Sequence, residues 1–464
     1  MSSGGDEGLG HAVVIGAGIS GLLAARVLSD HFSQVTLIER DSMDAPRTWR
    51  SGVPQARHPH LLLARSQRIV EELFPGIWDD FKELDVPVFD FGSRTMMLFP
   101  TGFSPTVDSG VLCRSVSRPR YEAALRERVL ALPAVAYRDG SRVVGLDLDG
   151  PARRAVAVLV AGRGRKQASE DVRRVAADVV VDAGGRNSHL PHWLSASGLS
   201  RPRVSQVDPR LGYATRLYEI PDGVYLDWDI LAEFTRFPSA SRGCVGLRIE
   251  NNQVLFTLQG NGGDYPPGDE EGFAAFARSL RLDVTGMLAR LQARSPIYCY
   301  RNTVNRWYAY HRVPRWPQNL IVVGDAHCVF NPIYGQGITV ASQQAFLLRH
   351  MLEQRSGEPV SRTLCAYRRR QARQLRWPWL LSTSVDRGWQ EGPEPLPSRF
   401  LSRAADAWMC SLAGDAEMFS RFISVTHMLS GPGILLAPRS LARIGRAYLH
   451  HHRTTGGSRR EEIP

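Results

Sequence analysis

Apolar and polar positions near the start of the chain follow the periods of a strand, a helix and a second strand. Residues 12–15 form a short apolar run typical of a buried parallel strand. Apolar positions then recur at helical spacing from Leu22 to Leu28, and another strand-like run covers 34–38. This succession predicts a βαβ unit, in which a crossover helix joins two parallel strands.

The same periods predict the elements of the remaining chain. Helical spacing of apolar residues occurs over 60–74 and 117–132, and again over most of the chain after residue 336. The strand-like segments are short apolar or alternating runs bounded by glycine, proline and polar residues. These segments are 86–116, 142–163, 179–182, 210–260 and 318–323.

The apolar strands at 12–15, 179–182 and 318–323 lie far apart, which indicates a nucleotide-binding sheet interrupted by a second domain. We therefore predict an α/β fold with a Rossmann-like domain, an antiparallel β-sheet substrate domain and a helical C-terminal region. The predicted boundaries are 10–85, 113–205 and 301–351 for the Rossmann-like domain, 86–112 and 206–300 for the substrate domain, 352–455 for the helical region, and 1–9 and 456–464 for flexible tails.

A glycine motif follows the first strand. Gly16, Gly18 and Gly21 form G-x-G-x-x-G, which allows a tight turn and close approach of the backbone to a pyrophosphate at the helix N-terminus. Glu39, at the end of the second strand, is placed to accept hydrogen bonds from ribose hydroxyls and would repel a 2′-phosphate. The motif predicts NAD or FAD and does not distinguish the two. The residues expected to bind are Gly16, Ala17, Gly18, Ile19, Ser20, Gly21, Glu39 and Arg40.

The net charge of +11 raises the question of nucleic-acid binding. Only two of the 57 basic residues, Lys82 and Lys166, are lysines, and the densest basic cluster, 367–376, is interpreted as the solvated face of a helix. Such arginine-rich usage indicates a coding bias, so no nucleic-acid partner is expected.

Composition also bounds location and metal chemistry. No apolar run reaches the ~18 residues that span a bilayer, and the opening segment lacks the regions of a signal peptide. We therefore expect a cytoplasmic protein without a transmembrane segment. No C-x-x-C pair occurs, so the cysteines are expected to be reduced thiols and no metal site is predicted. The cysteines are Cys113, Cys244, Cys299, Cys328, Cys365 and Cys410.

The segment 320–352 carries a more specific pattern: G-D-A, a later proline, then G-Q-G opening a helix. It resembles the late flavin motif of the flavoprotein monooxygenases similar to p-hydroxybenzoate hydroxylase. The matching residues are Gly324, Asp325, Ala326, Pro332, Gly335, Gln336 and Gly337. Two further segments resemble motifs of the same family, and their matching residues are Arg118 in 117–125 and Asp182, Gly185, Arg186 and Ser188 in 179–188.

The resemblance implies a resident, non-covalent FAD. Arg118 would lie near the ribityl chain and pyrophosphate, and Asp325 would accept hydrogen bonds from ribityl hydroxyls. The helix that begins near Gly337 would direct its positive dipole at the N1–C2=O edge and stabilise the anionic reduced flavin. The other cofactor-binding residues expected are His60, Gly324, Pro332, Gly335 and Ile338.

Some positions leave alternatives open. By counted offset, His58 or His60 falls where relatives place a basic residue near the flavin, but a histidine that only caps a helix fits equally well. His327 stands one place earlier than the family's usual histidine, Cys328 follows it, and Thr339 replaces a common asparagine. These departures leave the transfer of residue roles near the ring open.

Segments 51–76, 213–220 and 302–326 resemble a branch of the family that acts on secondary metabolites, including polyene epoxidases of polyether biosynthesis. This implies an FAD-dependent monooxygenase in secondary-metabolite or antibiotic biosynthesis, a monomer or homodimer. NAD(P)H would bind transiently and reduce FAD, and O2 would form a C4a-hydroperoxyflavin. That species would epoxidise or hydroxylate a lipophilic, polyketide-like substrate.

A non-redox cyclase of polyenes, of the [4+2] type, would keep FAD for structure and carry identical motifs, so it remains the alternative. No catalytic base is assigned. The sheet domain is expected to cover the flavin's reactive face, with the C-terminal helices packed outside it. Several tryptophans are candidates for a lipophilic cavity, although each alone is more typical of a core residue. They are Trp49, Trp228, Trp307, Trp377 and Trp379.

Overall fold

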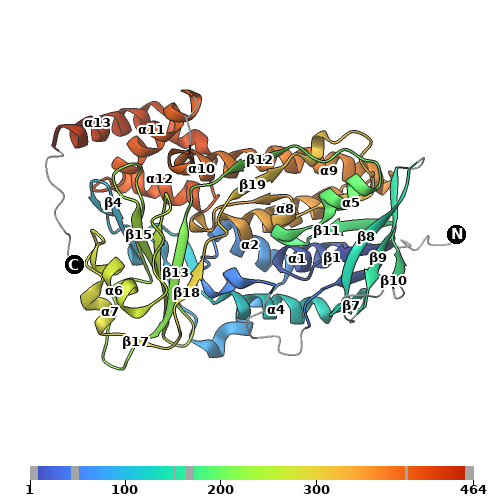
Figure 1. Ribbon diagram of the computed structural model, residues 1–464, viewed down its shortest axis with the longest axis horizontal. Helices are drawn as coiled ribbons and strands as arrows, with labels where there is room; N and C mark the ends of the chain where they lie inside the picture. The colour runs from blue at the N-terminus through green and yellow to red at the C-terminus, as the bar shows by residue number, and fades with distance from the viewer. Residues whose placement is uncertain (1–8, 43–51, 151–152, 163–171, 392–395, 455–464) are drawn as a thin grey trace.

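The computed structural model of the chain has its two largest sheets toward opposite ends of its long axis, and the last helices lie along one side (Figure 1). The predicted tails lie outside the described residues, except for Leu9, which begins the first strand. Lys166 and Trp49 also lie outside them. The described residues are 9–42, 52–150, 153–162, 172–391 and 396–454, without the side chains of 396–402 and 450–454.

The first sheet has five parallel strands in the order β20-β11-β1-β2-β7. Residues 12–15 of its middle strand are almost fully buried. A parallel strand covered on both faces must be apolar throughout, which is the pattern read from the sequence. The strands are β1 (Leu9–Ile15), β2 (Phe32–Ile38), β7 (Val135–Arg138), β11 (Val179–Asp182) and β20 (Leu320–Val322).

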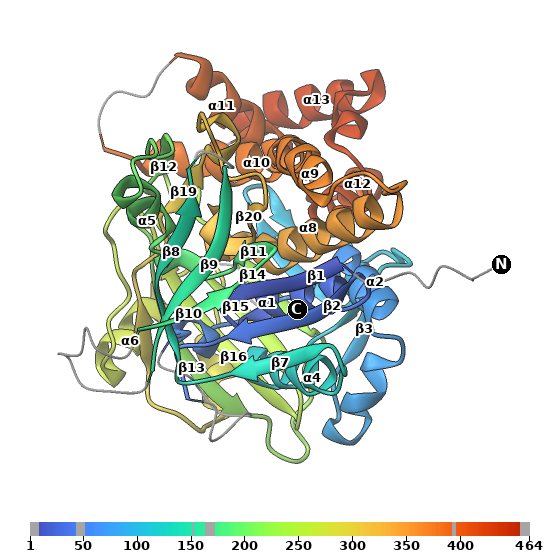
Figure 2. The same cartoon turned by 90° about the vertical axis from the view of Figure 1, so that its right-hand side faces the viewer.

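Helices cover one face of this sheet, and three short strands cover the other. The helices on this face are α1 (Ile19–Leu28), α2 (Ala64–Leu73), α4 (Arg118–Leu130) and α8 (Gln336–Glu353), whereas α5 (Leu190–Ala196) packs on the other face with the three strands. The three strands pair antiparallel in the order β10-β9-β8 (Figure 2). Their bounds are β8 (Arg142–Asp149), β9 (Arg154–Ala161) and β10 (Val172–Ala176).

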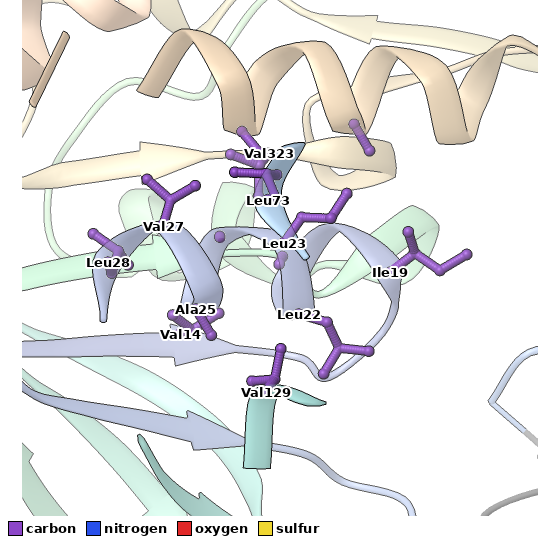
Figure 3. Packing of buried hydrophobic residues seen from close by; sticks show 14 of the residues in the cluster. Val14, Ile19, Leu22, Leu23, Ala25, Val27, Leu28, Leu73, Val129 and Val323 are labelled. Atoms are coloured by element: carbon purple, nitrogen blue, oxygen red, sulfur yellow. The ribbon is translucent and has the colours of Figure 1, made fainter. Parts of the chain in front are cut away.

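Alternate side chains of β1 enter two different cores. Val14 packs under α1, where Leu73 of α2, Val129 of α4 and Val323 also converge (Figure 3). Val13 points the other way, into the core formed with β8–β10. Burying each such side chain stabilises the folded state by ~1.5–3 kcal/mol. The two cores therefore hold the carboxyl edge of the sheet in place.

The second sheet is antiparallel except where β14 and β4 run parallel, and its order is β17-β13-β16-β15-β14-β4-β5, with β18 also paired to β13. Helices α6 (Glu270–Arg278) and α7 (Thr285–Ala289) cover one face through Phe273, Phe276 and Met287. The strands are β4 (Thr95–Phe99), β5 (Gly102–Phe103), β13 (Gly212–Glu219), β14 (Ile230–Glu233), β15 (Arg242–Ile249), β16 (Gln253–Gly260), β17 (Gln292–Ala293) and β18 (Tyr298–Tyr300).

Two smaller pairings join segments that the sequence pattern left separate. β12 (Val204–Val207) pairs with β19 (Asn305–Tyr308), which in turn pairs with β21 (Cys328–Val329). The proposed domain boundary after residue 205 therefore falls inside a strand. β3 (Val88–Asp90) and β6 (Leu112–Arg114) form a separate pair, next to the short helix α3 (Phe91–Arg94).

The C-terminal helices lie on the other face of the second sheet. Phe419 and Phe422 of this region pack in one core with Phe99 of the sheet. The C-terminal helices were expected to pack outside the sheet domain, and their apolar faces cover the sheet's free face. No helix in the described part of the chain has the length and apolar character to cross a membrane. The helices on this face are α10 (Arg376–Asp386), α11 (Leu396–Cys410), α12 (Ala416–Thr426) and α13 (Pro438–Thr454), whereas α9 (Val360–Gln374) packs in the core of the first sheet through Leu364 and Tyr367.

Candidate active site

Two cavities adjoin each other and share part of their walls. The smaller, of about 270 Å³, is at the carboxyl edge of the parallel sheet, and the larger, of about 550 Å³, lies between the antiparallel sheet and the C-terminal helices. Carboxyl edges of parallel sheets are the usual place for nucleotides. The residues that border both cavities are Gln55, His60, Leu61, Tyr300, Pro332 and Gly335.

The first glycine loop borders the smaller cavity. Gly16 has φ +95°, and α1 begins without a side-chain cap at Gly18, so its first N–H groups face the loop unpaired by a capping side chain. A Cβ at Gly21 would lie 1.9 Å from the carbonyl oxygen of Gly16, so this glycine allows α1 to pack against the turn. Ile19 and Ser20 also border the cavity, whereas Ala17 and Gly21 do not.

Glu39 borders the same cavity and holds the loop. Its carboxylate accepts hydrogen bonds from the N–H groups of Ala17, at 2.8 Å, and Asp41, at 3.0 Å. Arg40 is a neighbour on the cavity wall. The acidic residue thus lies where the sequence pattern placed it, and it also ties β2 to the glycine turn.

The middle motif shapes the next part of the wall. The Asp182 carboxylate accepts hydrogen bonds from the Ser188 hydroxyl, at 2.5 Å, and the Gly184 N–H, at 2.9 Å. Burial raises the pKa of Asp182 to about 6, although both hydrogen bonds oppose this shift. Arg186 reaches across to Asn302, so the motif forms a fixed turn beside the cavity. Gly185 lies in that turn with φ +71°.

The late motif forms the opposite wall. Gly324 has φ +60°, and a Cβ there would lie 2.3 Å from the Ser20 hydroxyl oxygen, so the first and late loops touch. Helix α8 begins after Gly335, which has φ +62° and provides no side-chain cap. Its first N–H groups are available to a ligand, as the dipole argument requires. The predicted residues of this motif that border the smaller cavity are Gly324, Asp325, Pro332, Gly335, Gly337 and Ile338.

Arg118 fits an anionic ligand. It borders the smaller cavity at the start of α4, and its buried Nε has no hydrogen-bond acceptor among the described residues. Its nearest carboxylate, on Glu122, lies 3.8 Å away. A guanidinium beside two uncapped helix N-termini is suited to a pyrophosphate. The residues present therefore fit FAD.

The two candidate histidines have different surroundings. His60 Nε2 lies 2.9 Å from the carbonyl oxygen of Gln55, and burial lowers its pKa to about 3. His58 follows a short 3-10 helix, Pro54–Arg57, as its C-cap, and its Nδ1 lies 2.6 Å from the hydroxyl oxygen of Thr215. Burial lowers the pKa of His58 to about 4. Both imidazoles are neutral at pH 7, and His60 is the one between the cavities.

The sequence did not indicate one buried carboxylate, which lies behind the late loop. Asp386, at the end of α10, accepts hydrogen bonds from Asn305, at 2.6 Å, Asn331, at 2.9 Å, and the Tyr334 hydroxyl, at 2.9 Å. Burial raises its pKa to about 6. Tyr213 donates to Asn331 at 3.0 Å. No motif marks Asp386, because its partners come from segments distant in sequence.

The residues that depart from the family motif lie away from both cavities. His327 is buried in the core and packs near Tyr310. Burial lowers its pKa to about 3. Cys328 is buried in β21, and burial raises the pKa of its thiol well above the usual value.

The tryptophan that borders the larger cavity was not among the candidates from the sequence. Among the described tryptophans, Trp408 of α11 borders it. Trp228, Trp307, Trp377 and Trp379 belong to packed cores instead. Helix α11 reaches the cavity only through tertiary packing, so local sequence carried no signal for Trp408.

The fold of the chain is similar to that of solved flavin-dependent enzymes. No family model matches the chain. Its structure is similar to that of the flavin-dependent brominase Bmp2, with a TM-score of 0.65 and 13% identity over 96% of this chain and 100% of that one. It is also similar to 2-methyl-3-hydroxypyridine-5-carboxylic acid oxygenase, with a TM-score of 0.59 and 17% identity over 84% and 96%.

A third similar structure is pqsL, a probable FAD-dependent monooxygenase from Pseudomonas aeruginosa, with a TM-score of 0.61 and 14% identity over 90% and 100%. The chain therefore has the fold of flavin-dependent monooxygenases of the p-hydroxybenzoate hydroxylase-like class, and the predicted fold class is confirmed. The chain is 32% identical to Protein Rv3254 of Mycobacterium tuberculosis (strain ATCC 25618 / H37Rv) over 96% of its own length and 95% of that protein. It belongs to the family of Protein Rv3254.

Proposed function

We propose that the protein binds FAD in the smaller cavity and transfers one oxygen atom of O2 to a lipophilic molecule in the larger cavity. The observation that carries this proposal is the junction of the cavities at the late loop, where Pro332 and Gly335 border both. A cofactor and a substrate held in the two cavities would meet there.

The proposed roles follow from the contacts of each residue. Arg118 and the uncapped N-terminus of α1 would hold the pyrophosphate, and Glu39 would accept hydrogen bonds from the adenosine ribose. Asp325 would take the ribityl hydroxyls, and the N-terminus of α8 would face the pyrimidine edge of the ring. Reduced FAD supplies the chemistry that activates O2.

Reduction by NAD(P)H is the second part of the proposal. The sequence contains one dinucleotide fingerprint, at Gly16, Gly18 and Gly21, and FAD would occupy it. The reductant would therefore bind transiently. NADH and NADPH are both substrates to be assayed.

The larger cavity supports a lipophilic acceptor. Its wall includes Phe91, Met97, Ile230, Leu247 and Phe422, which would exclude water from the reacting atoms. A polyketide-like alkene or ring, epoxidised or hydroxylated, fits this wall and the resemblance of 51–76 to secondary-metabolite enzymes. The neutral His58 beside Thr215 is a polar group available to orient it.

The deciding experiment is turnover of candidate polyenes and polycyclic polyketides under 18O2 with NAD(P)H, read by mass spectrometry. One labelled oxygen atom in the product supports the proposal. A product of unchanged mass, formed equally without NAD(P)H or O2, would establish the cyclase alternative. A halogenated product in the presence of bromide or chloride would assign the chemistry of the brominase neighbour instead.

A second experiment tests the cofactor directly. The purified protein should contain FAD in about a one-to-one ratio, and acid precipitation should release all of it. The cysteine next to the late motif, Cys328, borders neither cavity, which supports non-covalent binding. Flavin that stays on the precipitated polypeptide would contradict this part of the proposal.

A further inference from the structure

Helix α13 and the turn before it leave apolar side chains open to solvent. Leu436, Leu441 and Leu449 are 70%, 51% and 60% exposed. Leu441 and Leu449 lie on one face of the helix, with the exposed Gly445 midway between them. Grouped exposed apolar side chains are typical of a surface that contacts another molecule.

The other side of α13 packs on the protein. Ile444 packs against the core that contains Phe419 and Phe422, and Ser440 is buried. The helix lies at the outer edge of the C-terminal region, beyond α11 and α12 (Figure 1; Figure 2). It therefore has one face fixed to the protein and one face that no described residue covers.

Arginine side chains accompany the exposed leucines. Helix α13 contains no aspartate or glutamate, and Arg439 and Arg446 are exposed. Within the described part of the chain neither pairs with a carboxylate, whereas Arg443 pairs with Asp415 and Glu417. Because Arg446 precedes Leu449 by three residues, the two are neighbours on the helix surface. Leucines beside unpaired arginines match a boundary of acyl chains and anionic headgroups.

This face of α13 lies near an exposed edge of the larger cavity. Tyr448 of α13 interacts electrostatically with Arg236, which pairs with Asp406 of α11 at 2.6 Å. Phe237, next in the chain, is 47% exposed and borders the cavity, as does the exposed Arg403 of α11. We call Arg236, Phe237 and Arg403 the cavity rim. The rim has the same apolar and basic character as α13.

We propose that α13 and the cavity rim dock on an anionic lipid surface, so that the rim of the larger cavity faces the bilayer. The leucines and Phe237 would enter the acyl boundary, and Arg439 and Arg446 would contact lipid phosphates. This inference goes beyond the proposed oxygen transfer and requires neither flavin chemistry nor a substrate.

Two other occupants fit this face less well. A two-fold contact between two copies of α13 would bring the arginines of both copies together, and like charges repel. Nucleic acid would pair with the arginines through its phosphates but offers little apolar surface to the exposed leucines. The net charge of +11 favours an anionic lipid surface over a neutral one.

The test is flotation of the full chain, in its oxidised holo form, with two kinds of vesicle. One kind is phosphatidylcholine alone, and the other is equal parts phosphatidylcholine and phosphatidylglycerol. L441S/L449S removes the apolar stripe, R439Q/R446Q removes two charges, and F237S alters the rim.

The matched controls lie on β10, at the other end of the long axis (Figure 1). V172S replaces an exposed apolar side chain, and R173Q/R174Q removes two exposed arginines, which changes the net charge as much as R439Q/R446Q does. Thermal unfolding of every variant shows that it remains folded.

The wild-type protein should bind the anionic vesicles and not the phosphatidylcholine vesicles, and added salt should weaken binding. R439Q/R446Q should weaken it about twentyfold, since one arginine near an anionic surface accounts for about a fivefold change. L441S/L449S should weaken it at least about tenfold, because inserted leucine surface is lost. F237S should weaken it about threefold or more, and both controls should stay within about twofold of wild type.

Absence of binding to anionic vesicles, or an equal loss in R173Q/R174Q, would overturn the proposal. So would a dimer, measured by sedimentation without vesicles, that L441S/L449S converts to a monomer. Vesicle binding by F237S at the wild-type level would overturn the placement of the rim on the bilayer. Flavin content is measured on the same samples, and absence of FAD would refute the proposed function without changing the result of flotation.

Discussion

At the scale of single residues, Glu39 has a role in the proposed binding site and another in holding the fold. Glu39 borders the smaller cavity, as its position after β2 predicts. Its carboxylate also accepts hydrogen bonds from the N–H groups of Ala17 and Asp41. The carboxylate therefore orders the glycine turn as well as the proposed ribose site. Its substitution should affect binding more than a lost ligand contact alone.

Glu39→Ala should weaken FAD binding at least ten- to hundredfold, because the loss of one charge-assisted hydrogen bond of ~1.5–3 kcal/mol alone accounts for that factor. Flavin release on dilution, followed by fluorescence, measures the affinity. Glu219→Gln removes an exposed carboxylate that pairs with Arg294 on the far sheet, and it should have no effect. Unchanged FAD occupancy in Glu39→Ala would refute the assignment of the adenosine end.

Substitutions at two glycines of the first loop should affect stability and FAD binding separately. Gly21→Ala places a Cβ 1.9 Å from the Gly16 carbonyl oxygen, so α1 must move, at a cost of ~1–3 kcal/mol in stability. Gly18→Ala meets no atom within 4 Å and has φ −76°, so the protein should fold normally. Its methyl group would enter the smaller cavity, so FAD binding should fall. Thermal unfolding and flavin titration of both variants check this contrast.

At the scale of elements, α10 and the late loop form one unit. Asp386 collects donors from Asn305, Asn331 and Tyr334, so the C-terminal helices hold the loop that borders both cavities. A buried acceptor with three donors is costly to remove, because each donor loses its partner. The helical region is therefore a structural part of the site.

Asp386→Ala should destabilise the protein by ~3 kcal/mol or more and weaken FAD, because three buried donors lose their acceptor. Denaturant unfolding and flavin titration measure the two effects. Asp147→Asn, which removes an exposed partner of Arg174, is the control and should stay within ~1 kcal/mol of wild type. Wild-type FAD affinity in Asp386→Ala would disprove the link between α10 and the loop.

At the scale of the molecule, buried titratable groups set the dependence of stability on pH. Burial lowers the pKa of His58 to about 4 and of His327 and His427 to about 3, below the ordinary 6.5. Their contribution is complete above pH 6.5 and is lost as the pH falls, because the unfolded chain binds more protons. Asp182 and Asp386, with pKa raised to about 6, act in the opposite direction below pH 6.

The histidines outnumber the two carboxyl groups, so the free energy of unfolding should fall as the pH drops from 7 to 5. His327→Leu should reduce this slope by up to ~1.4 kcal/mol per pH unit, since one proton no longer binds on unfolding. His192→Gln, at an exposed position, should leave it unchanged. Urea unfolding at each pH provides the slopes, and an unaltered slope in His327→Leu would contradict the prediction.

The sequence by itself determined the local framework of the nucleotide site. Gly16, Gly18, Glu39 and the late glycines lie on the smaller cavity because turn geometry and helix starts depend on residues close in sequence. The middle-motif turn, with Asp182, follows for the same reason. The apolar runs of β1, β11 and β20 likewise indicated a buried parallel sheet.

Only the tertiary structure decided what surrounds the proposed reaction. Trp408 and His427 border the larger cavity, and Asp386 holds the late loop, from helical segments with no motif and across sequence separations that periodicity does not span. The C-terminal helices line the larger cavity because the free face of the antiparallel sheet needs an apolar cover, and that demand arises only once the sheet exists. Local backbone geometry thus determines the proposed cofactor site, whereas long-range packing forms the proposed substrate cavity.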